Sequence, residues 1–152
     1  MNQFDTVLSV MIVNRREISG ELASRLVSDC VAFAGERGWD ICAAVCDPRG
    51  ALVALLRTDH VVMPAIEFAI DKAYTAATLR TSTQGFFERA DARPALKLGL
   101  TNRPRMLVFP GGFSVFHDGD CIGGLGVSGA EDHEDVECAV AVIEAAGLKT
   151  EA

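Results

Sequence analysis

Two ionisable side chains in this 152-residue sequence have the types and positions that proton-transfer chemistry needs. Lys72 is the only lysine among the first 96 residues and lies in the largely apolar run AIEFAIDKAYTAATL. Such a lysine either pairs with a carboxylate of the protein or binds a substrate carboxylate through its charge. His60 directly follows Asp59, which can raise the basicity of an imidazole that titrates near neutral pH. His60 and Lys72 are therefore candidate catalytic residues, although His60 can equally be an ordinary loop histidine.

Two glycine-rich stretches are candidates for ligand contact through the backbone. The pair Gly111 and Gly112 is interpreted either as a bulge or tight loop or as a ligand-facing loop. The run GGLGVSG at 123–129 places Gly126, Ser128 and Gly129 before a helix, where free N–H groups attract anions. Acidic residues crowd the start of that helix and oppose an anionic ligand there, so a purely structural role is the alternative.

Composition and charge exclude several classes of partner. The sequence has 14 Lys and Arg against 21 Asp and Glu, a formal net charge of −7. Without a basic run, neither nucleic acid nor an anionic membrane is expected as a partner. The five cysteines are odd in number and mostly lie in apolar runs, which favours buried thiols in a reducing, cytoplasmic location. No zinc-type spacing is present, and no metal site is expected.

Hydrophobic periodicity and turn residues predict alternating groups of helices and strands. Ser19 is typical of a helix N-cap, Pro64 of a first helical turn, and Ser128 with Glu131 of a capping box. Asp47-Pro48-Arg49-Gly50 and Asp118-Gly119 are typical of hairpin turns. The pattern predicts helices over 19–35, 64–79, 86–90 and up to 146, and strands over 41–46, 51–57, 105–109, 113–117 and 121–129.

The order of these elements favours one α+β domain over residues 1–152. Strands joined by hairpins form antiparallel sheets, and helices cover them. We therefore expect a single compact domain with a central antiparallel sheet of about five strands flanked by helices. A Rossmann fold would need strict alternation of strands and helices, which the pattern does not show.

Four segments together resemble the GlcG/HbpS-like family, which includes the C-terminal domain of PduO-type proteins. They are AAVCDPRGALVALLRTD, AIEFAIDKAYTAATL, FPGG at 109–112 and DGDCIGGLGVSGAEDHED, spanning nearly the whole chain. The resemblance implies profilin-like layering with a core over about 18–147, and it implies a homo-oligomer. Some relatives bind haem or a corrinoid, and in haem-binding relatives an axial histidine comes from near the first helix. This sequence has no histidine before His60.

The resemblance also singles out His60, because relatives usually carry a glycine after the arginine-x-aspartate that corresponds to Arg57-Thr58-Asp59. A titratable ring at a turn position that favours glycine implies a compensating role. Our leading hypothesis is thus a catabolic enzyme that deaminates or tautomerises a small unsaturated carboxylate such as an aromatic ring-cleavage product. Arg57, Asp71 and the glycine-rich stretches would bind this anionic substrate, and no cofactor is expected. The alternatives are a haem- or corrinoid-binding protein and a non-catalytic accessory oligomer of a catabolic pathway.

Overall fold

Four antiparallel strands form the central sheet of the computed structural model, which describes residues 3–152. The sheet has the order β2-β1-β4-β3, built from β1 (Cys42–Cys46), β2 (Leu52–Arg57), β3 (Gly112–His117) and β4 (Asp120–Ser128). The two predicted hairpins are present. Asp47 fastens the first through hydrogen bonds that its carboxylate accepts from the backbone of Arg49 and Ala51. Asp118 and Gly119 form the second, and both have positive φ, as a tight hairpin turn requires.

The expected fifth strand over 105–109 is wrong, because this segment is irregular. Arg105 has φ 72° and Pro110 has no N–H, so neither end of the segment suits a ladder. The side chain of Thr75 takes the place of a partner strand. Its hydroxyl accepts a hydrogen bond from the N–H of Leu107 and donates one to the carbonyl of Arg105. The segment is therefore fastened to a helix instead of a sheet edge.

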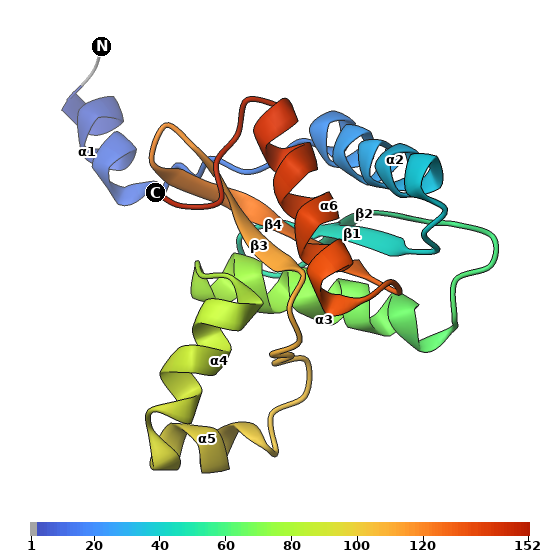
Figure 1. Ribbon diagram of the computed structural model, residues 1–152. Coiled ribbons are helices and arrows are strands. Elements are labelled where there is room, and N and C mark those ends of the chain that lie inside the picture. The colour runs from blue at the N-terminus through green and yellow to red at the C-terminus, as the bar shows by residue number, and fades with distance from the viewer. Residues whose placement is uncertain (1–2) are drawn as a thin grey trace.

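Helices cover both faces of the sheet (Figure 1). One face packs against α3, and the other packs against α2 and α6, which also contact each other. The helices are α1 (Gln3–Met11), α2 (Gly20–Arg37), α3 (Pro64–Leu79), α4 (Thr83–Asp91), α5 (Pro94–Leu100) and α6 (Asp132–Ala145). The α+β architecture expected from the sequence is confirmed, with one strand fewer.

The alternation of side chains along β1 divides the core into two layers. Ala43 and Val45 belong to a large cluster with side chains of α2 and α6, and Cys42 and Cys46 belong to a smaller one under α3. All five cysteines are free, and four of them are buried, as the sequence predicted.

The start of α6 corrects a second expectation. Ser128 is the last residue of β4 and does not cap the helix. The cap is Glu131, whose carboxylate accepts from the backbone at Glu134, and the carboxylate of Glu134 accepts from the N–H of Glu131. The capping box thus exists three residues later, because β4 continues through the serine.

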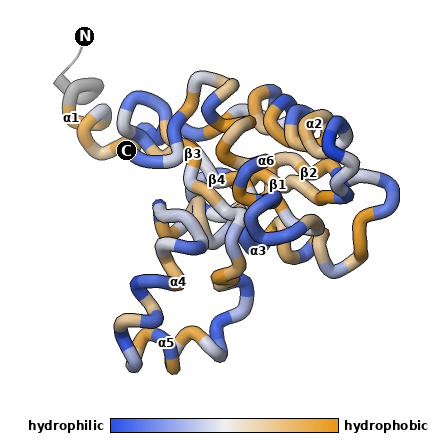
Figure 2. The backbone as a smooth tube through the Cα atoms, in the orientation of Figure 1, coloured by the Kyte–Doolittle hydropathy of each residue, from blue (hydrophilic) through white to orange (hydrophobic). Residues whose placement is uncertain are grey.

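The first helix projects from the body of the molecule (Figure 1), and its second half, residues 7–11, is mostly hydrophobic (Figure 2). Val10 and Met11 are 81% and 74% exposed. Such a set of exposed apolar side chains is unusual for an isolated surface. The homo-oligomer expected from the resemblance stays a prediction. Within residues 3–152, no helix has the length and apolar character needed to cross a membrane.

Candidate functional site

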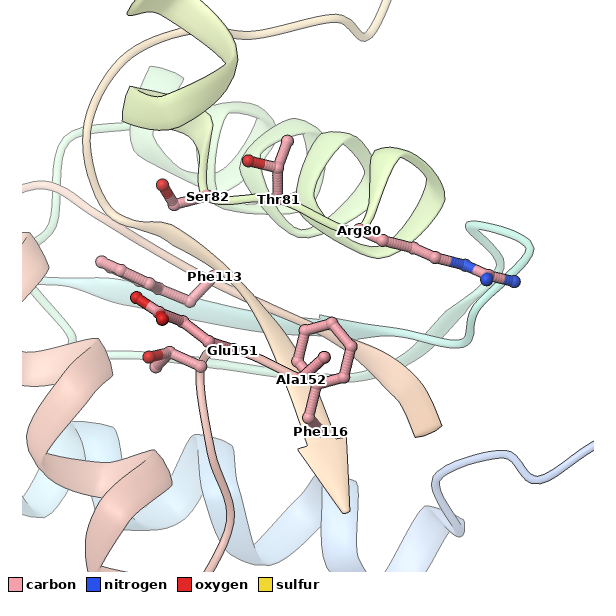
Figure 3. A pocket seen from close by; sticks show the side chains of 8 residues that line it. Arg80, Thr81, Ser82, Phe113, Phe116, Glu151 and Ala152 are labelled. Carbon is pink, nitrogen blue, oxygen red and sulfur yellow. The ribbon is translucent and has the colours of Figure 1, made fainter. Parts of the chain in front are cut away.

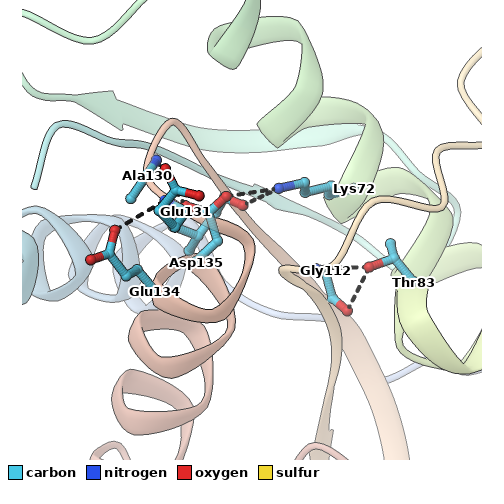
Figure 4. A network of polar contacts seen from close by, with 8 residues as sticks. Lys72, Thr83, Gly112, Ala130, Glu131, Glu134 and Asp135 are labelled. Carbon is cyan, nitrogen blue, oxygen red and sulfur yellow. Dashed lines mark hydrogen bonds and ion pairs between the residues drawn. The ribbon is translucent and has the colours of Figure 1, made fainter.

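Lys72 is buried and forms an ion pair with Asp135 (Figure 4). Its ammonium Nζ lies 3.1 Å from Oδ2 of Asp135 and donates a hydrogen bond of 2.7 Å to the carbonyl of Val127. The other carboxylate oxygen of Asp135 accepts from the N–H of Ala130. The structure therefore realises the first alternative from the sequence, a lysine that pairs with a carboxylate, and the pair joins α3, the end of β4 and α6.

Burial makes both charges of this pair costly. It raises the pKa of the Asp135 carboxyl to about 6, against the opposing attraction of Lys72. It also lowers the pKa of the Lys72 ammonium, against the attraction of Asp135. A desolvated ion pair with several internal hydrogen bonds is typical of a structural contact that fixes two helices. It is also typical of catalytic groups, whose pKa values are shifted by their surroundings.

The glycines that the sequence singled out lie close to this pair and against protein atoms. A Cβ on Gly126 would be 2.1 Å from the carbonyl oxygen of Ala69 in α3, and one on Gly111 would be 3.0 Å from Nζ of Lys72. Gly112 contacts Thr83, whose hydroxyl accepts from the glycine N–H (Figure 4). Gly129, with φ 128°, lies against the carbonyl of Asp40. These glycines permit close packing of backbone on backbone.

The remaining predicted site residues lie away from the ion pair. His60 is exposed in the loop between β2 and α3, and the guanidinium of Arg57 donates to loop carbonyls at Thr58 and Asp59. Asp71 pairs with Arg105 at 3.4 Å. Among residues 3–152, no hydrogen bond or ion pair links His60 to Lys72. The structure brings Lys72, Gly111, Gly112, Gly126 and Ser128 into one region and leaves His60 and Arg57 in another.

A cavity of about 800 Å³ lies at the opposite end of the sheet from the start of α3. Its wall comes from residues 13–16 before α2, from 48–49 and 119–121 in the two hairpins, and from Arg80, Phe116 and Ala152. Segments distant in the sequence meet here because both hairpin turns lie at the same end of the sheet. The volume is within the usual range of small-molecule and cofactor sites.

Four arginines line this cavity although the whole chain is acidic. Arg16 is engaged by the β3–β4 hairpin, with its guanidinium 2.8 Å from the Asp120 carboxylate. Arg49 lies 3.4 Å from the carboxylate of Glu17. Within the described chain, Arg15 and Arg80 have no hydrogen bond or ion pair through their side chains. The cavity therefore carries an excess of positive charge, which suits an anionic ligand.

One group that can ligate iron lies in the cavity wall, and a second lies next to it. The thiol of Cys121 is half-buried in the cavity wall. Burial raises the pKa of the Cys121 thiol, and the charge of Arg80 acts in the opposite direction. The imidazole of His117 adjoins the wall, with Nδ1 2.7 Å from the guanidinium of Arg16. Its Nε2 has no hydrogen-bond partner within residues 3–152.

A smaller cavity of about 290 Å³ adjoins the first and shares Arg80 and Phe116 with it (Figure 3). Figure 3 shows Arg80 extending away from Ser82 and Thr81, on the side opposite Phe113. Arg80 ends α3 with φ 55°. Its side chain thus belongs to the larger cavity as well as to the rim of the smaller one.

Sequence reasoning missed the arginine cavity. The Arg15-Arg16 pair precedes the first predicted helix, and Arg49 lies in a predicted hairpin turn, but no spacing rule joins them to Arg80. Both hairpin turns lie at one end of the sheet because β1 pairs antiparallel with β4, and the sequence pattern does not give that pairing.

Comparison with known proteins places the chain among proteins of related fold and sequence. Protein GlcG of Escherichia coli K12 is 32% identical over 111 residues, covering 73% of this chain and 81% of GlcG. The crystal structure of a double mutant of HbpS from Streptomyces reticuli has a TM-score of 0.80 at 26% identity, covering 89% of this chain and 90% of HbpS. A crystal structure of a PduOC:haem complex has a TM-score of 0.81 at 24% identity, covering 90% and 99% of the two chains, and shows a shared fold.

The family model described as haem degrading protein HbpS-like matches residues 18–144. That range begins just before α2 and ends within α6, so it includes the whole sheet and both helical layers. The chain therefore belongs to the HbpS-like family.

Proposed function

We propose that this chain binds haem in the arginine-lined cavity. The observation that carries the proposal is a cavity of about 800 Å³ with four guanidinium groups in a protein of net charge −7. Haem carries two propionate carboxylates, and guanidinium is the group that binds carboxylates best, often with two parallel hydrogen bonds. Family membership and the solved PduOC:haem complex of the same fold support the choice of ligand.

The donor set of the cavity fits haem. Haem iron in proteins is held by imidazole, thiolate, thioether or phenolate ligands. This cavity offers the thiol of Cys121, and the imidazole of His117 lies beside it. The early histidine of haem-binding relatives has no counterpart here, so these two residues are the candidates in its place. Bound haem would supply iron redox chemistry, while the chain's own residues hold its carboxylates and limit its access to water.

Haem fits the cavity better than a corrinoid. Corrinoids in their usual form carry amides on the ring periphery in place of free carboxylates. Amides gain little from a guanidinium that lacks a carboxylate partner, and Arg15 and Arg80 both lack one within the described chain. The charge of the cavity is therefore better matched by the propionates of haem.

A titration of the purified chain with haemin tests this proposal. Equimolar binding with a shifted and sharpened Soret band at micromolar haemin is the expected result. Val13→Glu adds a carboxylate to the cavity wall, and Val62→Glu adds the same charge at a similarly exposed position outside it. We expect Val13→Glu to weaken binding by about tenfold or more and Val62→Glu to leave it unchanged, because like charges repel the propionates. An unshifted Soret band, or equal loss in both variants, would reject the proposal.

The enzymatic hypothesis from the sequence used His60 and Lys72, which lie in different regions of the structure. Its remaining support is Lys72, now paired with Asp135. Acid–base catalysis on an unsaturated carboxylate needs an ionisable group within hydrogen-bond reach of the substrate. The shifted pKa values of the pair favour such a role, and the close packing around it favours a structural one. Crystals soaked with a muconate-type acid distinguish the two. Density against Lys72 would support catalysis, and density confined to the arginine cavity, or none, would contradict it.

A further inference from the structure

We infer that Arg15 and Arg80 are the specificity-determining residues of the cavity and that each binds one carboxylate of a dicarboxylic porphyrin. The inference rests on the proposed haem-binding function and extends it. If the two carboxylates of the ligand decide binding, the metal in the porphyrin ring contributes less to selection. The ligand class is therefore porphyrins with two free propionates, with or without iron.

The arginines of the cavity fall into two pairs by their present partners. Arg16 contacts the Asp120 carboxylate and the ring of His117, which fixes it against the β3–β4 hairpin. Arg49 faces Glu17 at 3.4 Å. These two charges are largely compensated, so a ligand carboxylate would gain less from them.

Arg15 and Arg80 are exposed, and within residues 3–152 neither guanidinium has a carboxylate partner. An uncompensated guanidinium in a cavity wall attracts an anion without first breaking an ion pair. Two such groups match the two propionates of one porphyrin in number and in charge. The remaining wall, which includes Phe116, offers contact to the ring.

The backbone of Arg80 is a second, independent observation. Arg80 ends α3 in the left-handed conformation, with φ 55° and its N–H donating to the carbonyl of Ala76. Glycine or asparagine is preferred at this position, because a side chain costs about 1 kcal/mol there. In spite of that cost, Arg80 occupies this position and its side chain lines the cavity.

The two arginines come from different elements, and this gives the site its selectivity. Arg15 lies in the segment that leads from α1 to α2, Arg80 follows the end of α3, and both line the cavity. A ligand with one carboxylate offers one anionic group to these two cations. A porphyrin with both propionates esterified satisfies neither.

Fluorescence titration with metal-free protoporphyrin IX and with its dimethyl ester tests the inference on the full chain. We expect the free acid to bind within about tenfold of haem and the ester to bind about 100-fold more weakly, since each charged hydrogen-bonding contact is worth about tenfold. Arg15→Gln and Arg80→Gln should each weaken binding of the free acid by about tenfold. Neither should change binding of the ester. Arg25→Gln, on the exposed surface of α2, is the matched control and should bind like the unmodified chain.

The outcomes separate this inference from the proposed function. If the ester binds as tightly as the free acid, or if Arg15→Gln and Arg80→Gln behave like Arg25→Gln, the inference is wrong even when haem binds. If haem binds and metal-free protoporphyrin does not, the iron selects the ligand and the inference is also wrong. If neither ligand binds, the proposed function fails as well.

Discussion

Lys72 and Asp135 are 63 positions apart in the sequence, yet their charged groups meet at 3.1 Å with 2% and 3% of the side chains exposed. The contact joins the helix on one face of the sheet to a helix on the other face. It passes the end of β4, where Lys72 also donates to the carbonyl of Val127. This ion pair at the end of the central strand β4 thus ties the two layers of helices together.

Replacing one partner of this pair should destabilise the protein far more than replacing both partners together. Lys72→Met leaves the Asp135 carboxylate without its partner, and Asp135→Leu leaves the Lys72 ammonium without its partner. We expect each single variant to cost about 3–5 kcal/mol in the free energy of unfolding. The double variant Lys72→Met/Asp135→Leu should recover most of that loss, because it leaves no buried charge. Urea unfolding of the four proteins measures the coupling. Additive losses would show that the two groups act independently.

The pair should also give stability a distinctive dependence on pH. The pKa of Asp135 is raised to about 6 in the folded protein from an ordinary value near 3.8. Between these two values the unfolded chain releases this proton first, so the contribution of Asp135 to stability falls as the pH rises from about 4 to about 6. Thermal unfolding across this range, compared with the double variant that lacks both groups, isolates the effect. A difference between the two proteins that stays constant over the range would contradict it.

The sequence was sufficient for the parts of the fold that depend on local patterns. Asp47 and Gly119 marked turns, Ser19 marked a helix start, and the alternation of Cys42 and Cys46 marked one face of a strand. It failed over 105–109, where hydrogen bonds with the hydroxyl of distant Thr75 replace a strand partner. It also assigned the cap of α6 to Ser128, because a capping-box pattern fits two registers three residues apart.

The candidate site was harder to predict, because its residues are joined by the tertiary fold alone. The isolation of Lys72 in an apolar run correctly drew attention to a buried charge, but its partner Asp135 is one of several acids near the start of α6. The arginine cavity gathers residues from three loops and a helix end. No periodicity connects Arg15 with Arg80, so only coordinates reveal that they share a cavity.

Gly126 should prove essential for packing between β4 and α3. An added Cβ would be 2.1 Å from the carbonyl oxygen of Ala69 and 2.6 Å from the N–H nitrogen of Ala73. These are backbone atoms that cannot yield cheaply, so Gly126→Ala should cost about 2 kcal/mol or more in the free energy of unfolding. Gly35→Ala in α2 is the matched control, because nothing lies within 4 Å of its Cβ position and alanine favours a helix by about 0.5–1 kcal/mol. Chemical denaturation measures both, and equal effects would disprove the packing role.

If the absorption spectrum of the haem complex is that of thiolate-ligated iron, we expect Cys121 to supply the thiolate. The thiol lies in the cavity wall, and the neighbouring charge of Arg80 favours its thiolate form. Since burial raises the pKa of the thiol, we expect the thiolate signature of the ferrous–CO complex to grow as the pH rises above neutrality. Cys121→Ser should abolish that signature with only a modest loss of affinity, and His117→Ala should leave it intact. Cys46→Ala, at a buried thiol under α3, is the control for removing a cysteine. A spectrum that changes in His117→Ala and not in Cys121→Ser would assign the iron to the imidazole instead.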